Sequence, residues 1–195
     1  MANISHFDTD FVLDKFLSVF WEKGYGATTT KGLAKSAGIS ESSLFNSFRN
    51  KREIYIRILR RYSEKSIHVR EQMEAEKSAL AGIRNYWTSL AAMAKDPARN
   101  KGCLITNATV EQIDDPEVLQ FLKSVHSDYD KAFQRTLNRA VAQGELKSDT
   151  DTKALSQYLS HSAQGLRVLS KISPDSKKIN NIVNMTMSTM ALYQT

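Results

Sequence analysis

Two short helical segments joined by a glycine-containing turn constrain the fold of this chain more than any other feature. Apolar residues at helical spacing predict one helix that carries Leu33 and Ala37 and ends at Gly38, and a second that begins at Ser40 and buries Leu44. Ala37 is small enough to let the two helices approach, and Gly38 can adopt the positive φ of a tight turn without strain. Two short helices with this connection are typical of a helix-turn-helix motif.

The rest of the chain predicts further helices and no strand. Proline (3 residues) and glycine (8 residues) are scarce among the 195 residues, which argues against an all-β fold and against a disordered linker protein. Apolar positions repeat every three or four residues and predict helices over 11–21, 52–79, 80–93, 115–143, 151–172 and 175–193, with a helix or an apolar loop over 103–113. The expected fold class is all-α, with about nine helices.

Positive charge is concentrated around the two short helices. The chain carries 27 Lys and Arg against 21 Asp and Glu, a net charge of +6. Residues 28–61 contain eight basic and two acidic side chains, so their charge of +6 equals the whole excess. We therefore expect this segment to contact a polyanion. For Lys35, Arg57 and Arg60, the alternative is a solvated helix face.

The residue pattern offers no support for a membrane protein, a metalloprotein or an enzyme. No apolar run is long enough for a membrane helix, and no signal-peptide pattern precedes the first helix. Cys103 is the single cysteine, which excludes an internal disulfide and a Cys-rich zinc site. The four histidines are scattered and no glycine-rich phosphate loop occurs, so we expect no enzyme activity, no cofactor and no metal. A cytoplasmic location is the default expectation.

Residues 12–59 contain a set of short motifs: Gly24-Tyr25, Thr29-Thr30, Leu33-Ala34, Ala37-Gly38-Ile39-Ser40, Leu44-Phe45, Phe48 and Lys51-Arg52-Glu53. With these motifs, the segment resembles the DNA-binding domain of the tetracycline-repressor-like (TetR) transcription regulators. It implies a helix-turn-helix DNA-binding domain over 1–50 and a helical effector-binding and dimerisation domain over 51–195, with 52–79 as the connecting helix. It also implies double-stranded operator DNA and an unknown small-molecule effector as partners.

The resemblance also assigns roles to residues around the turn. Thr30 and Lys31 are expected to contact phosphates. The residues expected to approach bases are Glu41, Ser42, Ser43 and Asn46, and those expected to lie against the DNA backbone are Phe45, Ser47 and Lys51. The expected DNA-binding set is Thr30, Lys31, Ser40, Glu41, Ser42, Ser43, Phe45, Asn46, Ser47 and Lys51. Ser42 stands where the family often has glycine or proline, Phe45 replaces a tyrosine, and Asn46-Ser47 replaces aromatic or histidine residues. The operator sequence is therefore not transferable, although Asn46 can pair with adenine if it enters the groove squarely.

The C-terminal part contains side chains suited to an apolar effector pocket, although the same residues also make an ordinary core. The expected pocket residues are Tyr86, Trp87, Met93, Cys103, Phe121 and Tyr129. The segment Lys101-Gly102-Cys103-Leu104, followed by Asn107, resembles one branch of the family in which some members sense oxidants or electrophiles through the cysteine. A helix N-terminus and a lysine would favour a reactive Cys103 thiolate. The alternative is an unreactive buried thiol.

Apolar stripes on the last two helices predict a homodimer interface. The expected interface residues are Tyr158, Ser162, Gly165, Leu166, Leu169, Ile182, Val183, Thr186 and Met190. The alternative is that these stripes pack only on the rest of the protomer. Together the expectations describe a sequence-specific DNA-binding regulator, a repressor released by a small molecule or by modification of Cys103. The competing hypotheses are a helical adaptor that binds nucleic acid through charge alone, without an effector, and an enzyme on a helical scaffold.

Overall fold

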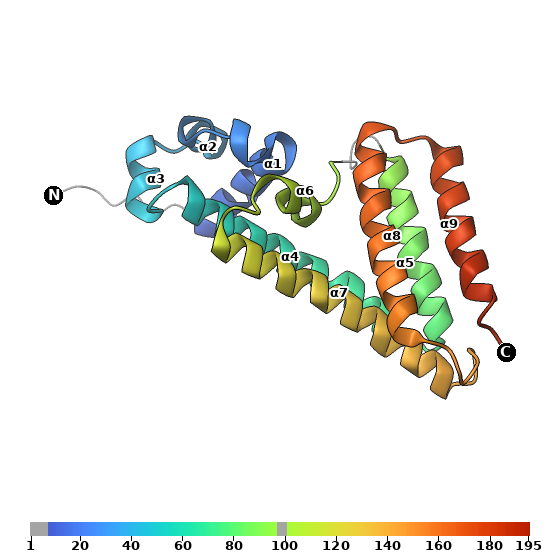
Figure 1. Cartoon of the computed structure of the whole chain (residues 1–195). Coiled ribbons are helices and arrows are strands. Elements are labelled where there is room, and N and C mark those ends of the chain that lie inside the picture. The colour runs from blue at the N-terminus through green and yellow to red at the C-terminus, as the bar shows by residue number, and fades with distance from the viewer. Residues whose placement is uncertain (1–7, 97–100) are drawn as a thin grey trace.

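The computed structural model describes residues 8–96 and 101–195, and these residues form nine α-helices (Figure 1). The helices are α1 (Thr9–Ala27), α2 (Thr30–Ala37), α3 (Glu41–Ser47), α4 (Lys51–Ala75), α5 (Ala79–Lys95), α6 (Leu104–Glu111), α7 (Pro116–Ala142), α8 (Thr152–Ile172) and α9 (Ser176–Ala191). The all-α prediction is therefore confirmed for the described residues. Residues 1–7, which belong to the expected N-terminal domain, lie outside them.

The helices begin where the sequence supplies an acceptor for backbone N–H groups that have no partner in the first turn. Every described helix except α6 follows a residue whose side-chain oxygen accepts such N–H groups: Asp8, Thr29, Ser40, Asn50, Ser78, Asp115, Asp151 and Asp175. Pro116 then occupies the first turn of α7, where its missing N–H costs nothing. Local sequence thus sets the helix starts.

Three boundaries refine the prediction. Gly24 has a φ of +75° and interrupts α1, but the helix continues to Ala27 beyond it. Helix α4 ends at Ala75, four residues before the expected end, because Ser78 caps the next helix. The sequence allows either a helix or an apolar loop over residues 103–113, and the structure has the helix α6 there.

The nine helices are arranged as two ends joined by two long helices. Figure 1 shows α1, α2 and α3 at one end, and α5, α8 and α9 side by side at the other. Helices α4 and α7 lie next to each other along the length of the molecule, and α6 packs against α1 and α4. A change near α5 or α8 is thus connected to the helix-turn-helix end through α4, α6 and α7.

A single cluster of buried apolar side chains runs through both ends. At the helix-turn-helix end, the rings of Phe16 and Phe48 meet edge to face at 5.7 Å, and those of Phe20 and Tyr55 lie 5.0 Å apart. Burying each such ring stabilises the fold by about 1.5–3 kcal/mol. No helix in the described ranges is long and apolar enough to cross a membrane.

Candidate functional site

The turn between α2 and α3 has the geometry that the sequence predicts. Gly38 ends α2 with a φ of +67°, and its N–H donates to the carbonyl of Lys35. Ser40 begins α3, and its hydroxyl accepts the N–H of Ser43 at 3.0 Å. The left-handed conformation costs glycine little, so this turn fixes the angle between the two short helices.

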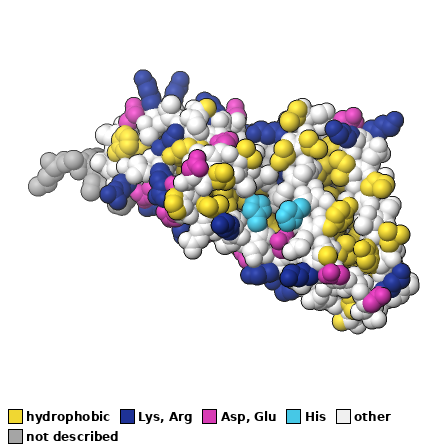
Figure 2. All heavy atoms as spheres, viewed as in Figure 1, with side chains coloured by type: hydrophobic (Ala, Val, Ile, Leu, Met, Phe, Trp, Pro, Cys, Tyr) yellow, Lys and Arg dark blue, Asp and Glu magenta, His cyan; other side chains and the backbone are white. Residues whose placement is uncertain are grey.

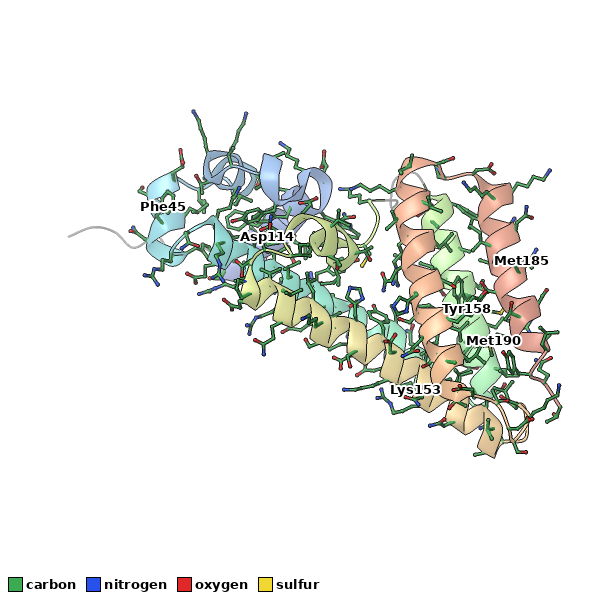
Figure 3. All side chains as sticks on the ribbon, viewed as in Figure 1. Phe45, Asp114, Lys153, Tyr158, Met185 and Met190 are labelled. Atoms are coloured by element: carbon green, nitrogen blue, oxygen red, sulfur yellow. The ribbon has the colours of Figure 1, made fainter. Side chains whose placement is uncertain are left out.

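One face of α3 is buried and the opposite face is exposed. Leu44 and Phe48 are buried in the core, which holds the helix in place. The exposed side carries Glu41, Ser42, Phe45, Asn46 and Ser47. Phe45 lies on α3 at the end of the molecule far from α8 and α9 (Figure 3). The structure therefore presents five of the predicted DNA-binding residues on one accessible surface.

The hydroxyl groups near the start of α3 are mostly engaged with one another. The Ser40 hydroxyl lies 2.8 Å from those of Ser42 and Ser43, and Thr30 donates to the Glu41 carboxylate at 3.4 Å. Across the described residues, the side chain of Asn46 makes no hydrogen bond. Its amide thus keeps both donor and acceptor groups for an external partner.

Most basic side chains of residues 28–61 form contacts with other residues of the protein. Four arginines form ion pairs with carboxylates of α1, α4 and α7: Arg52, Arg57, Arg60 and Arg61. Within the described ranges, no ion pair is formed by Lys31, Lys35 or Arg49, and their side chains are exposed. Figure 2 shows Lys and Arg side chains projecting at this end of the molecule. The charge available to a polyanion is therefore smaller than the net charge of the segment.

Lys51, which is predicted to contact a phosphate, also makes contacts within the protein. Its Nζ donates to the carbonyl oxygens of Tyr25 and Thr28, each at 3.0 Å, and lies 4.2 Å from the centre of the Tyr25 ring. These contacts join the start of α4 to the end of α1. Lys51 is half-buried by them, so its charge is used to hold the helix-turn-helix unit together.

Helix α6 contacts the end of α1 through polar groups. The Glu111 carboxylate accepts the backbone N–H of Tyr25 at 2.8 Å, and the indole N–H of Trp21 donates to the carbonyl of Gly102 at 3.0 Å. Directly after α6, Asp115 pairs with Arg52 of α4. The segment from Gly102 to Asp115 is thus fastened to the helix-turn-helix end at three points.

A cavity of about 140 Å³ lies among α4, α5, α7, α8 and the start of α6. Four of the predicted pocket residues line it: Tyr86, Met93, Cys103 and Tyr129. The other two predicted pocket residues do not line this cavity, since Trp87 is fully buried in the core and Phe121 packs half-buried against that core. A second hollow of about 570 Å³ lies among α6, α7 and α8 and contains none of the predicted residues.

Arg167 lines the first cavity but is not among the pocket residues predicted from the sequence. Its Nη2 donates to the hydroxyl of Tyr86 at 3.0 Å, whereas its Nη1 is buried with no hydrogen-bond partner in the described part of the chain. The available signal was an arginine between Leu166 and Val168, within an otherwise apolar stretch of α8. Such a position is rare for a charged residue unless it is paired.

Cys103 is buried at the start of α6 and faces the same cavity. Burial raises the pKa of its thiol, but the positive charge of Arg167 and interactions with Thr106 and Tyr62 outweigh burial. The net pKa therefore lies below the ordinary value for cysteine, which favours the thiolate.

Helices α8 and α9 expose apolar side chains along their outer faces. The most exposed are Tyr158, Val168, Leu169, Ile172, Met185 and Leu192. Tyr158 on α8 and Met185 on α9 are labelled in Figure 3, and Figure 2 shows hydrophobic side chains gathered over these two helices. We call these six residues the α8–α9 apolar face. Scattered exposed apolar residues are common, whereas several on neighbouring helices are typical of an interface.

Three predicted interface residues are wrong because the protomer itself covers them. Leu166, Thr186 and Met190 are 2%, 2% and 4% exposed, since α9 packs against α5 and α8. The other six are at least partly accessible: Tyr158, Ser162, Gly165, Leu169, Ile182 and Val183. A stripe on one helix therefore serves the core on one side and the surface on the other.

Comparison with known proteins agrees with this architecture. A family model for bacterial regulatory proteins of the tetR family matches residues 12–58, and one for the tetracyclin repressor-like C-terminal domain matches residues 79–186. The chain is 33% identical over 193 residues to the HTH-type transcriptional regulator YezE of Bacillus subtilis (strain 168), covering 97% of this chain and 100% of that protein. It is 27% identical over 184 residues to the HTH-type transcriptional repressor ComR of Escherichia coli (strain K12), covering 93% and 88%.

The fold is also that of a solved regulator. A cysteine mutant of the TetR family regulator CifR, complexed with 26 bp double-strand operator DNA, matches with a TM-score of 0.85 and 22% identity, covering 96% of this chain and 98% of that one. The fold and the helix-turn-helix end define a DNA-binding transcriptional regulator. The chain belongs to the TetR family, as the resemblance over residues 12–59 predicts.

Proposed function

We propose that this chain is a repressor that binds operator DNA as a homodimer and is released by a small molecule or by modification of Cys103. The observation that carries the proposal is the exposed polar face of α3, held in place by Leu44 and Phe48. A helix presented in this way fits the major groove, where Asn46 reads adenine through its N6 and N7 atoms. Thr30 and Lys31 hold the neighbouring phosphates.

The α8–α9 apolar face supports the dimer. Two copies that pack these faces together form a four-helix bundle about a two-fold axis and remove the exposed apolar surface from water. The same two-fold axis relates the two α3 helices, so they read the two halves of a palindrome in successive major grooves. The name of ComR, a repressor, supports the direction of regulation.

The cavity and the α6 segment support the release mechanism. Gly102 and Cys103 line the cavity, and the Gly102 carbonyl accepts the Trp21 indole N–H of α1. An occupant, or an added group on Cys103, that moves this segment also moves its contacts with α1 and α4. The dimer has two arrangements, and the occupant or the added group favours the one in which the α3 helices are wrongly spaced for DNA. It therefore shifts the population of dimers toward that arrangement.

A footprint on the intergenic DNA upstream of the gene tests the DNA-binding part. We expect a protected, palindromic site that is occupied by two protomers in a titration by light scattering. An even, sequence-independent protection would instead support the charge-only adaptor. The few unpaired basic side chains at the helix-turn-helix end favour the first result, because charge-only binding grows with the number of phosphates neutralised.

Thiol reactivity tests the modification route separately. If Cys103 acts as a sensor, its thiol in the native protein reacts with a maleimide, and Cys103→Ser removes the response to electrophiles while operator binding remains. A native thiol that does not react, or a Cys103→Ser protein that keeps every response, contradicts that route and leaves the ligand route in place.

A further inference from the structure

The cavity contains a positive charge with which no carboxylate of the described residues forms an ion pair. Arg167 projects from α8 into the cavity, where its guanidinium lies 5.5 Å from the ring centre of Tyr129 and 5.9 Å from that of Tyr86. Its Nη2 has a partner in the Tyr86 hydroxyl, and its Nη1 is buried without one. An arginine stays charged at any physiological pH, so deprotonation does not relieve this arrangement.

None of the cavity-lining residues in the described part of the chain is an Asp or a Glu. Aromatic faces and one hydroxyl compensate a partly buried guanidinium only in part, because a charge removed from water normally requires an opposite charge with good hydrogen bonds. The Cys103 thiol faces the same cavity and interacts with Thr106 and Tyr62. It is not a hydrogen-bond partner of Nη1, which has no acceptor among the described residues.

The remaining walls set the size and polarity of an occupant. Val69, Leu90 and Met93 supply apolar surface on the side formed by α4 and α5. A cavity volume of about 140 Å³ is close to the roughly 150 Å³ that accommodates a benzene ring. The space therefore suits a compact molecule with an apolar body and one anionic group.

We propose that the cavity binds a small organic carboxylate, with its carboxylate oxygen accepting from Nη1 of Arg167 and its apolar body against Val69, Leu90 and Met93. The inference rests on the proposed function, because it names the chemical class of the effector. Arginine and a carboxylate form short, charge-assisted hydrogen bonds in a geometry that a neutral ligand cannot reproduce. Arg167 thus discriminates acids from uncharged molecules of the same shape.

The test compares benzoate with benzamide, and hexanoate with hexanamide, by calorimetric titration of the full-length protein at pH 7. Each amide matches its acid in shape, but it is uncharged and carries an NH2 donor in place of one carboxylate oxygen. We expect at least one acid to bind about tenfold or more tightly than its amide, since an unpaired buried donor then gains a charged acceptor. Equal binding of acid and amide, tighter binding of both amides, or no binding by any of the four contradicts the inference.

Variants of Arg167 test whether this residue causes the preference for acids over amides. Arg167→Met removes the charge at similar length, and we expect the acid-to-amide ratio to fall to about one. Arg167→Lys keeps the charge and retains part of the ratio, which guards against a variant that folds poorly. Lys153→Met is the matched control, because Lys153 is an exposed cation on the same helix, away from the cavity (Figure 3). A ratio that survives in Arg167→Met overturns the assignment.

The same samples are titrated with upstream and scrambled DNA. Specific DNA binding without acid preference would refute only the carboxylate inference. Acid preference without specific DNA binding would refute the repressor proposal and leave the binding site standing.

Discussion

Replacing Lys51 by methionine tests whether this lysine stabilises the fold or contacts DNA. Lys51 donates to two backbone carbonyls, of Tyr25 and Thr28, each at 3.0 Å, and stacks on the Tyr25 ring. Hydrogen bonds to a charged group contribute about 1.5–3 kcal/mol, so losing this donor reduces the free energy of unfolding by about 2 kcal/mol. For a chain of this length, that lowers the melting temperature by about 4–8 °C.

Lys31→Met is the matched comparison because Lys31 is exposed and has no ion pair among the described residues. We expect its melting temperature to change by less than about 2 °C, as is usual for surface substitutions. The slope of log affinity against log salt should fall by about 2 per dimer, one for each lost phosphate contact. Lys51→Met should leave that slope unchanged.

Two measurements decide the outcome: thermal unfolding followed by circular dichroism, and fluorescence anisotropy of DNA binding between 0.05 and 0.3 M salt, a range of about sixfold over which such slopes are resolved. A Lys51→Met protein that has the melting temperature of the wild type and a reduced slope of log affinity against log salt would refute the structural role. It would restore Lys51 to the phosphate contacts.

Three further predictions concern stability and assembly. Gly24→Ala should destabilise the protein by at least about 1 kcal/mol in urea unfolding, because the φ of +75° disfavours alanine and its Cβ would lie 2.6 Å from the Glu111 carboxylate; unchanged stability would contradict the α1–α6 contact. Arg61 lowers the pKa of Asp14 from 3.8 to about 2, so this carboxylate stabilises the fold above about pH 4 and loses its effect as the pH falls toward 2. The wild type should therefore be more stable than Asp14→Asn at pH 7, and a difference that persists at pH 2 would refute the assignment. Tyr158→Glu should shift the protein toward monomer in light scattering and weaken operator binding by at least about tenfold, whereas an unchanged dimer would place the interface elsewhere.

Helix positions followed from local sequence because each depends on nearby residues. Asx and hydroxyl caps, the glycine at Gly38 and apolar spacing act within a few positions of the chain, so the helix-turn-helix and the all-α fold were readable without tertiary information. The exposure of Asn46 followed for the same reason, since Leu44 and Phe48 define the buried side of α3.

Contacts between residues far apart in the chain could not be predicted in the same way. The carbonyls that bind Lys51 lie more than 20 positions earlier in the chain, and only the packing of α1 on α4 brings them together. An apolar stripe does not reveal whether its partner is the same protomer, which is why Leu166 and Met190 were assigned to the interface. Arg167 was missed because its significance depends on the tyrosines around it, which come from other helices.

The ratio of affinities for upstream intergenic DNA and a scrambled duplex, measured by anisotropy at about 0.15 M salt, tests the central claim most directly. A dimer that reads bases through α3 prefers the upstream DNA by about 10³ or more, and Asn46→Ala lowers that preference by about tenfold or more while leaving scrambled DNA unaffected. Equal affinity for the two wild-type complexes, with no site recovered by selection from random sequences, would contradict a regulator that reads an operator.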